Sequence, residues 1–235
     1  MAERKFDGFG EKALPFLKAL GFHQDRQWFQ ENKDLYESQL RLPLIALVED
    51  ASNELPKAGI PLHGTRKSSL FRINRDIRFT KEKHPYNTHV SAVLTRNGTK
   101  KDTGGIYLHI AAGDCYFASG LWMPEGPQLK AMREQIIARR SEFEAIIETL
   151  AAQDLHIGSE SMITRPPAGF KQWTDDPIMF WLRHKSFVTS RKFNDERIQS
   201  PALLDDMIEF GQQIMPLMSF IWRAVDPLRE DPTTE

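Results

Sequence analysis

The fold is decided by the stretch Gly105-Ile106-Tyr107-Leu108-His109-Ile110-Ala111, which is followed closely by Cys115-Tyr116-Phe117. Apolar residues alternate with others in both parts, as is typical of strands that are buried on one face. Gly113 and Asp114 between them form a turn signal of the kind that joins antiparallel strands. We therefore expect a β-hairpin here, because parallel strands would need a crossover of a dozen residues or more.

Two segments before this hairpin, residues 68–73 and 88–95, are also short and rich in β-branched and aromatic residues. Asn97-Gly98 is a second turn signal. Residues 66–122 are thus predicted to form an antiparallel sheet of about four to five strands in the middle of the chain.

Helical patterns flank the predicted sheet on both sides. Apolar residues recur at helical spacing in residues 11–20, and Asp25 and Pro43 fit the starts of two further helices. Helical spacing returns at residue 127, and Pro216 interrupts the last helical pattern. We predict one α+β domain over residues 1–225, in which helices 10–55 and 127–225 cover the sheet, followed by an acidic flexible tail at 226–235.

The composition is that of a globular protein, with 40% hydrophobic and 27% charged residues among 235. No apolar run has the length of a signal peptide or a transmembrane helix. Cys115 is the single cysteine, so no intramolecular disulfide can form. These features favour a cytoplasmic location without a membrane partner, and they leave the oligomeric state open.

Positive charge is concentrated in residues 66–101, which contain ten of the 31 Lys and Arg residues and two of the 32 Asp and Glu residues. Apolar residues alternate with the cations, which anchors the backbone to a core and argues against a fully solvated loop. Arginine forks match the geometry of carboxylate and phosphate groups. We therefore interpret the segment as a candidate anion site, whose ligand-binding residues are Arg72, Arg75, Arg78, Lys83, Tyr86 and Tyr107.

A spacing of three breaks the two-residue period of a strand, so Arg72, Arg75 and Arg78 cannot all share one face of a regular strand. Either the backbone turns near Asn74, or Arg75 points away from the other two. Asp76 is interpreted first as the partner of Arg75 or Arg78, and otherwise as a general base or metal ligand. The candidates for catalysis are Asp76, Tyr86 and His109.

Other site types lack their signatures. The seven histidines show no paired metal-binding spacing, and no phosphate-loop, dinucleotide or nucleophile-elbow motif occurs. We therefore predict no metal and no cofactor. Cys115 has no basic neighbour in sequence to activate it. A second basic cluster, His184-Lys185 with Arg191 and Lys192, is interpreted as a solvated helix end.

The pattern Arg72-x-x-Arg75-Asp76-x-Arg78-Phe79, followed by Lys83-x-Pro85-Tyr86, resembles the signature of an uncharacterised, mainly bacterial family of conserved hypothetical proteins that form a domain of unknown function. The resemblance extends over nearly the whole chain, from Phe6-x-Gly8-Phe9 to Leu129-x-x-Met132-Arg133. It implies no established reaction, cofactor or substrate.

Three functions remain in competition. The first is a small-molecule site, with an enzymatic role left open, in which the arginines hold a phosphate or carboxylate. The second is a nucleic-acid-binding module that uses the same basic residues on phosphates. The third is a non-catalytic interaction protein in which the Arg–Asp cluster is structural. A small-molecule site needs cations that converge on a cavity, whereas a nucleic-acid site needs them spread over an open surface.

Overall fold

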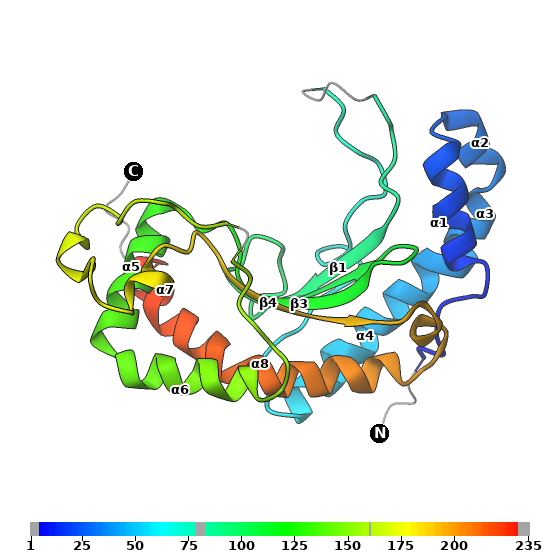
Figure 1. Ribbon diagram of the computed structural model, residues 1–235. Coiled ribbons are helices and arrows are strands. Elements are labelled where there is room, and N and C mark those ends of the chain that lie inside the picture. The colour runs from blue at the N-terminus through cyan, green and yellow to red at the C-terminus, as the bar shows by residue number, and fades with distance from the viewer. Residues whose placement is uncertain (1–4, 79–82, 160, 230–235) are drawn as a thin grey trace. The chain divides into compact units, whose positions relative to one another are not determined.

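The computed structural model describes residues 5–78, 83–159 and 161–229. Within these residues the α+β fold is confirmed, with one antiparallel four-stranded sheet in the middle of the chain and helices before and after it (Figure 1). The strands follow one another in the order β1 (Val90–Leu94), β2 (Ile106–Ile110), β3 (Cys115–Leu121) and β4 (Phe187–Phe193). β1 and β2 pair in the register Val90 with Ile110 and Leu94 with Ile106.

The helices before the sheet are α1 (Ala13–Phe22), α2 (Arg26–Glu31), α3 (Lys33–Tyr36), the π-helical turn η1 (Glu37–Arg41) and α4 (Leu42–Lys57). After β3 come α5 (Gly126–Ala138), α6 (Arg140–Ala151), the 3₁₀ turn η2 (Lys171–Trp173) and α7 (Met179–Leu182). β4 is followed by η3 (Asp195–Gln199), α8 (Leu203–Val225) and η4 (Asp226–Arg229). The first part of the predicted acidic tail is therefore helical, and residues 230–235 lie outside the described residues.

Two predicted helix starts are confirmed. Asp25 is the N-cap of α2, where its carboxylate accepts a hydrogen bond of 2.8 Å from the backbone N–H of Trp28. Pro43 lies in the first turn of α4, where its missing N–H costs nothing. The helical pattern after Asp25 breaks between α2 and α3 because Asn32 leaves the helical region at φ −108° and ψ 13°, whereas α3 continues into η1 with helical backbone angles.

The sheet has one apolar and one polar face, as the alternation in β2 predicts. Ile106, Leu108 and Ile110 are fully buried, whereas Tyr107 and His109 are half-buried on the opposite face. α4 packs against β1, and α8 contacts the apolar face through the stacked rings of Phe117 and Phe210. The polar face is therefore the one on which ligand-binding side chains of the sheet can lie.

The sequence prediction differs from the structure at two strands. Residues 68–73 form no regular strand; an isolated bridge joins Leu70 to Ala92 of β1. β4 lies inside the stretch predicted to be helical, and it includes Arg191 and Lys192. The interpretation of the second basic cluster as a helix end is thus wrong. The alternation that marks β4, with Phe187 and Thr189 buried and Ser190 and Lys192 exposed, is a strand signal.

The chain divides into two compact units. Unit 1 contains residues 1–117 and 191–212, and unit 2 contains residues 118–190 and 213–235. The boundaries fall inside β3, β4 and α8. In unit 2, the buried ring of Phe143 lies 5.4 Å from that of Trp181 and 5.5 Å from that of Phe220. Each unit therefore has apolar packing of its own.

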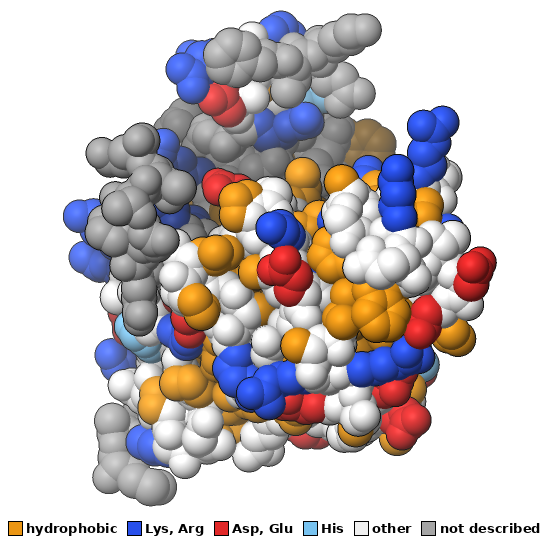
Figure 2. Space-filling view, turned by 90° about the vertical axis from the view of Figure 1, so that its left-hand side faces the viewer, with side chains coloured by type: hydrophobic (Ala, Val, Ile, Leu, Met, Phe, Trp, Pro, Cys, Tyr) orange, Lys and Arg blue, Asp and Glu red, His pale blue; other side chains and the backbone are white. Residues whose placement is uncertain are grey.

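Hydrophobic side chains occur in small groups between charged ones on the face seen in Figure 2. Among the described residues, no helix combines the length and the apolar character that crossing a membrane requires.

Candidate functional site

The basic segment is attached to the edge of the sheet at its start. The backbone N–H of Phe71 donates to the carbonyl of Ser91, and that of Val93 donates to the carbonyl of Ser69. The segment then extends away from the sheet, with residues 72–75 beside residues 85–87 (Figure 1). Two hydrogen bonds join these parts, from Arg75 N to the Pro85 carbonyl at 2.9 Å and from Asn87 N to the Ile73 carbonyl at 2.7 Å.

Because the backbone here is irregular, the two-residue period of a strand does not decide which way the arginines point. Arg72 and Arg75, three positions apart in sequence, line one cavity of about 520 Å³ that is broadly open to solvent. Lys100 reaches the same cavity from the turn between β1 and β2. The complete lining consists of Phe71, Arg72, Asn74, Arg75, Asp76, Asn87, His89, Ser91, Lys100 and Tyr107.

The cavity carries a surplus of positive charge. Within the part of the chain that the structure describes, neither Arg72 nor Arg75 forms an ion pair. Burial, which has the larger effect, and the positive charge of Arg72 both lower the pKa of Lys100. The guanidinium groups of Arg72 and Arg75 therefore keep their hydrogen-bond donors available at the cavity.

Asp76 lines the cavity, but its negative charge is balanced by an ion pair with Arg78. Arg78 is one of the two partners considered from the sequence. The closest contact joins Arg78 Nη2 to Asp76 Oδ2 at 2.7 Å, and both side chains are exposed. The side-chain hydrogen bonds from Arg78 hold the pKa of the Asp76 carboxyl below its ordinary value. Arg78 itself does not line the cavity.

Two further predicted ligand-binding residues also lie outside the cavity. Lys83 Nζ donates to the backbone carbonyl of Ile77 at 2.9 Å. The Tyr86 ring is buried, with 4% of the residue exposed, and it stacks on Phe29 of α2 at 4.3 Å. Burial, the largest effect, raises the pKa of the Tyr86 hydroxyl. Tyr86 thus anchors the segment to the helices and does not meet the cations at the cavity.

Tyr107 and His109, both predicted from the sequence, belong to a cluster of rings on the polar face of the sheet. The Tyr107 hydroxyl and His109 Nδ1 are 3.0 Å apart. The His109 ring lies 4.3 Å from that of His89 and is stacked on Tyr116 at 4.8 Å. Tyr107 and His89 line the cavity, so the ring cluster continues the site away from the arginines.

The two imidazoles of this cluster are neutral near pH 7. Burial, which has the largest effect, and the neighbouring His89 lower the pKa of His109 to about 4. The charge of Asp114 opposes this shift. Burial also lowers the pKa of His89 and raises that of Tyr107. The cluster thus offers uncharged rings and hydroxyl groups, whereas the arginines provide the charge.

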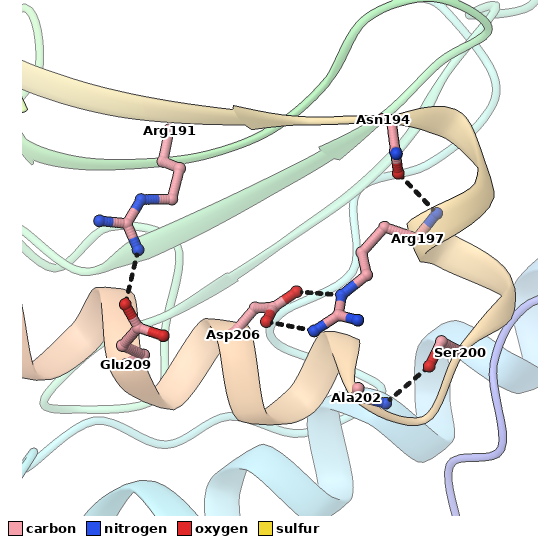
Figure 3. A network of polar contacts seen from close by, with 7 residues as sticks. All are labelled: Arg191, Asn194, Arg197, Ser200, Ala202, Asp206 and Glu209. Carbon is pink, nitrogen blue, oxygen red and sulfur yellow. Dashed lines mark hydrogen bonds and ion pairs between the residues drawn. The ribbon is translucent and has the colours of Figure 1, made fainter. Parts of the chain in front are cut away.

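Two other arginines of unit 1, Arg191 and Arg197, are bound to carboxylates, unlike Arg72 and Arg75. Figure 3 shows that Arg197 of η3 donates hydrogen bonds to both carboxylate oxygens of Asp206. It also shows that Arg191 of β4 forms an ion pair with Glu209, in which Nη1 and Oε1 are 3.3 Å apart. The side-chain oxygen of Asn194 caps the same turn by accepting from Arg197 N. These arginines hold β4, η3 and α8 together, so their role is structural.

The other candidates do not form a site. Among the described residues, no group of three or more His, Cys, Asp or Glu side chains is arranged to hold a metal ion. Cys115 is buried, and burial raises the pKa of its thiol to about 11, which disfavours the reactive thiolate. A second cavity, of about 640 Å³ in unit 2, has no Lys or Arg among the described residues that line it.

Lys100 and His89 were not nominated from the sequence. Lys100 follows the Asn97-Gly98 turn, where a solvated side chain is the ordinary expectation. His89 comes directly before β1, and its position beside His109 depends on the pairing of β1 with β2. The concentration of cations in residues 66–101 was the one signal that included Lys100.

Comparison with known proteins gives one match. A family model described as "Conserved hypothetical protein (DUF2461)" matches residues 12–220. No curated protein and no solved structure matches the chain.

Proposed function

The chain belongs to the DUF2461 family of conserved hypothetical proteins, whose description names no activity, and from the site itself we propose that it binds a small anionic ligand. The ligand carries a phosphate or carboxylate group that the guanidinium groups of Arg72 and Arg75 hold. Lys100 adds a third positive charge at the same cavity.

One observation carries this proposal: two arginines without an ion pair among the described residues converge with a lysine on a single cavity. Arg197, which supports the fold, takes a carboxylate partner in Asp206. Two guanidinium groups at one cavity provide the planar sets of donors that recognise phosphate and carboxylate oxygens. The volume of about 520 Å³ lies in the range of small-molecule sites.

The same observation favours a small ligand over the two competing functions. Cations that converge on a cavity fit a compact anion, whereas a nucleic-acid surface needs them spread out. The Asp76–Arg78 pair is a structural ion pair, but it leaves Arg72 and Arg75 unexplained. A reaction is not required by the proposal. If one occurs, Tyr107 and His109 are the groups positioned to move a proton, because Tyr107 lines the cavity and its hydroxyl lies 3.0 Å from His109 Nδ1.

Calorimetric titration with pyrophosphate, inorganic phosphate and citrate tests the proposal. We expect at least one of these anions to bind, and Arg72→Ala and Arg75→Ala each to weaken binding about 10- to 100-fold, the loss for a charge-assisted hydrogen bond. Lys100→Ala should weaken binding by a smaller factor, because a lysine offers a point charge without a fork.

The chain provides matched controls. Arg66 and Lys101 are exposed cations of the same basic segment that do not line the cavity. Arg66→Ala and Lys101→Ala remove the same charge and should change the affinity less than twofold. Equal losses for Lys100→Ala and Lys101→Ala, or for Arg75→Ala and Arg66→Ala, would show a diffuse charge effect and refute a specific site. Circular dichroism confirms that each variant is folded.

A further inference from the structure

The cavity that Arg72 and Arg75 line also contains three rings, those of Phe71, His89 and Tyr107. Phe71 is 42% exposed, so its ring is accessible from the cavity. Its ring meets the Tyr107 ring edge to face at 5.9 Å, and Lys100 Nζ lies 5.1 Å from its centre. An exposed ring beside cations gains buried area when a flat group covers it.

The rings form an uncharged part of the cavity. The His89 ring lies 4.3 Å from that of His109, and burial keeps both imidazoles neutral near pH 7. Arg72 and Arg75 supply positive charge in the same cavity. A ligand with an anionic group alone would satisfy the arginines and leave the rings uncovered.

Polar side chains accompany these rings. Asn74, Asn87 and Ser91 line the same cavity. Asn87 Nδ2 donates to the carbonyl of Arg72 at 3.1 Å, which leaves its side-chain oxygen as an acceptor. Amide and hydroxyl groups beside an aromatic surface match the hydrogen-bonding edge of a nucleobase.

From this combination, and resting on the proposed anion site, we propose that the ligand is a nucleoside 5′-phosphate. The phosphate lies on Arg72 and Arg75, and the base stacks on Phe71 beside Tyr107. The cavity volume of about 520 Å³ is far larger than one phosphate group needs and suits a ligand of nucleotide size. The same chemistry occurs in a free nucleotide and at the 5′-phosphorylated end of a single strand.

Titration with AMP and with ribose 5-phosphate tests the contribution of the base, because ribose 5-phosphate keeps the sugar and the phosphate but lacks the ring. Stacking on an aromatic side chain is expected to make AMP bind about 5- to 100-fold more tightly. Phe71→Leu should remove most of this preference and leave the affinity for ribose 5-phosphate unchanged. The matched control is Phe22→Leu, since Phe22 is 80% exposed on α1 and does not line the cavity.

The outcomes separate this inference from the proposed function. If ribose 5-phosphate and AMP bind equally through Arg72 and Arg75, the nucleotide inference is overturned and the anion site stands. An AMP preference that survives in Phe71→Leu also overturns it, because the base then lies elsewhere. If neither compound binds and phosphate does not bind either, both proposals fail. A short 5′-phosphorylated oligoadenylate distinguishes the sources: equal affinity with AMP indicates a free or terminal nucleotide, and much tighter, steeply salt-dependent binding indicates a strand.

Discussion

The first residues that the structure describes are held to α4 by one buried carboxylate. Asp50, which is 5% exposed, accepts hydrogen bonds through Oδ2 from the backbone N–H groups of Lys5 and Phe6, at 2.6 and 2.7 Å. Phe6 and Phe9 are 3% exposed, so this contact fixes a segment whose rings belong to the core. We predict that Asp50→Ala destabilises the protein substantially.

The magnitude follows from the two hydrogen bonds. A bond to a charged group contributes about 1.5–3 kcal/mol, and a buried N–H left without an acceptor costs about 1–3 kcal/mol. The Lys5 amide is only partly buried and can turn to water, whereas the Phe6 amide is buried. Asp50→Ala should therefore lower the free energy of unfolding by about 3 kcal/mol, which corresponds to a fall in Tm of roughly 6–12 °C for a chain of this size.

Urea denaturation followed by circular dichroism measures this loss, and hydrogen exchange at the Phe9 amide, which donates to the Ile198 carbonyl, reports on the segment itself. Glu49→Ala is the matched control, because Glu49 is the neighbouring carboxylate and meets Lys5 only in an exposed ion pair of 3.6 Å. Its cost should stay below about 0.5 kcal/mol. Equal costs for Asp50→Ala and Glu49→Ala would refute the reasoning.

Two further predictions concern β3 and the ring cluster. Gly120→Ala should cost more than about 3 kcal/mol in urea denaturation, because Gly120 has φ +135° and an added Cβ would lie 2.0 Å from the Phe187 carbonyl oxygen. Gly113→Ala, at φ +78° with open space around it, should cost only about 1 kcal/mol, and a reversed order would contradict this account. His109, with a folded pKa of about 4 against 6.5, contributes stability that is present above pH 6.5 and lost as the pH falls towards 4. Relative to His109→Gln, the protein should lose roughly 1–3 kcal/mol across that range, and an NMR titration that finds the His109 pKa near 6.5 would disprove it.

The sequence predicted the parts of the fold that depend on local patterns. Alternation defined β2 and β3, and Asp25 and Pro43 marked helix starts that the structure confirms. β4 was missed because its cations suggested a helix end, whereas its alternating burial follows from packing against elements distant in sequence. Local pattern alone does not decide between these alternatives.

The positive charge of the candidate site could be predicted from the sequence, but the full set of residues that line it could not. The concentration of cations led to Arg72 and Arg75, which line the cavity together with Tyr107. Tyr86 was indistinguishable in sequence from a ligand-binding tyrosine, because its stacking partner Phe29 lies 57 positions earlier. Lys100 enters the cavity from another turn, and only the tertiary fold brings it there.

The boundaries of the two units have a consequence for any attempt to dissect the molecule. Each unit is assembled from two separate stretches of chain, and the three crossings occur within β3, β4 and α8. A cut at any of these boundaries would divide a strand or a helix and would break backbone hydrogen bonds of that element. Neither unit can therefore be excised, inherited or exchanged as one continuous gene segment, and the chain must be handled as a whole.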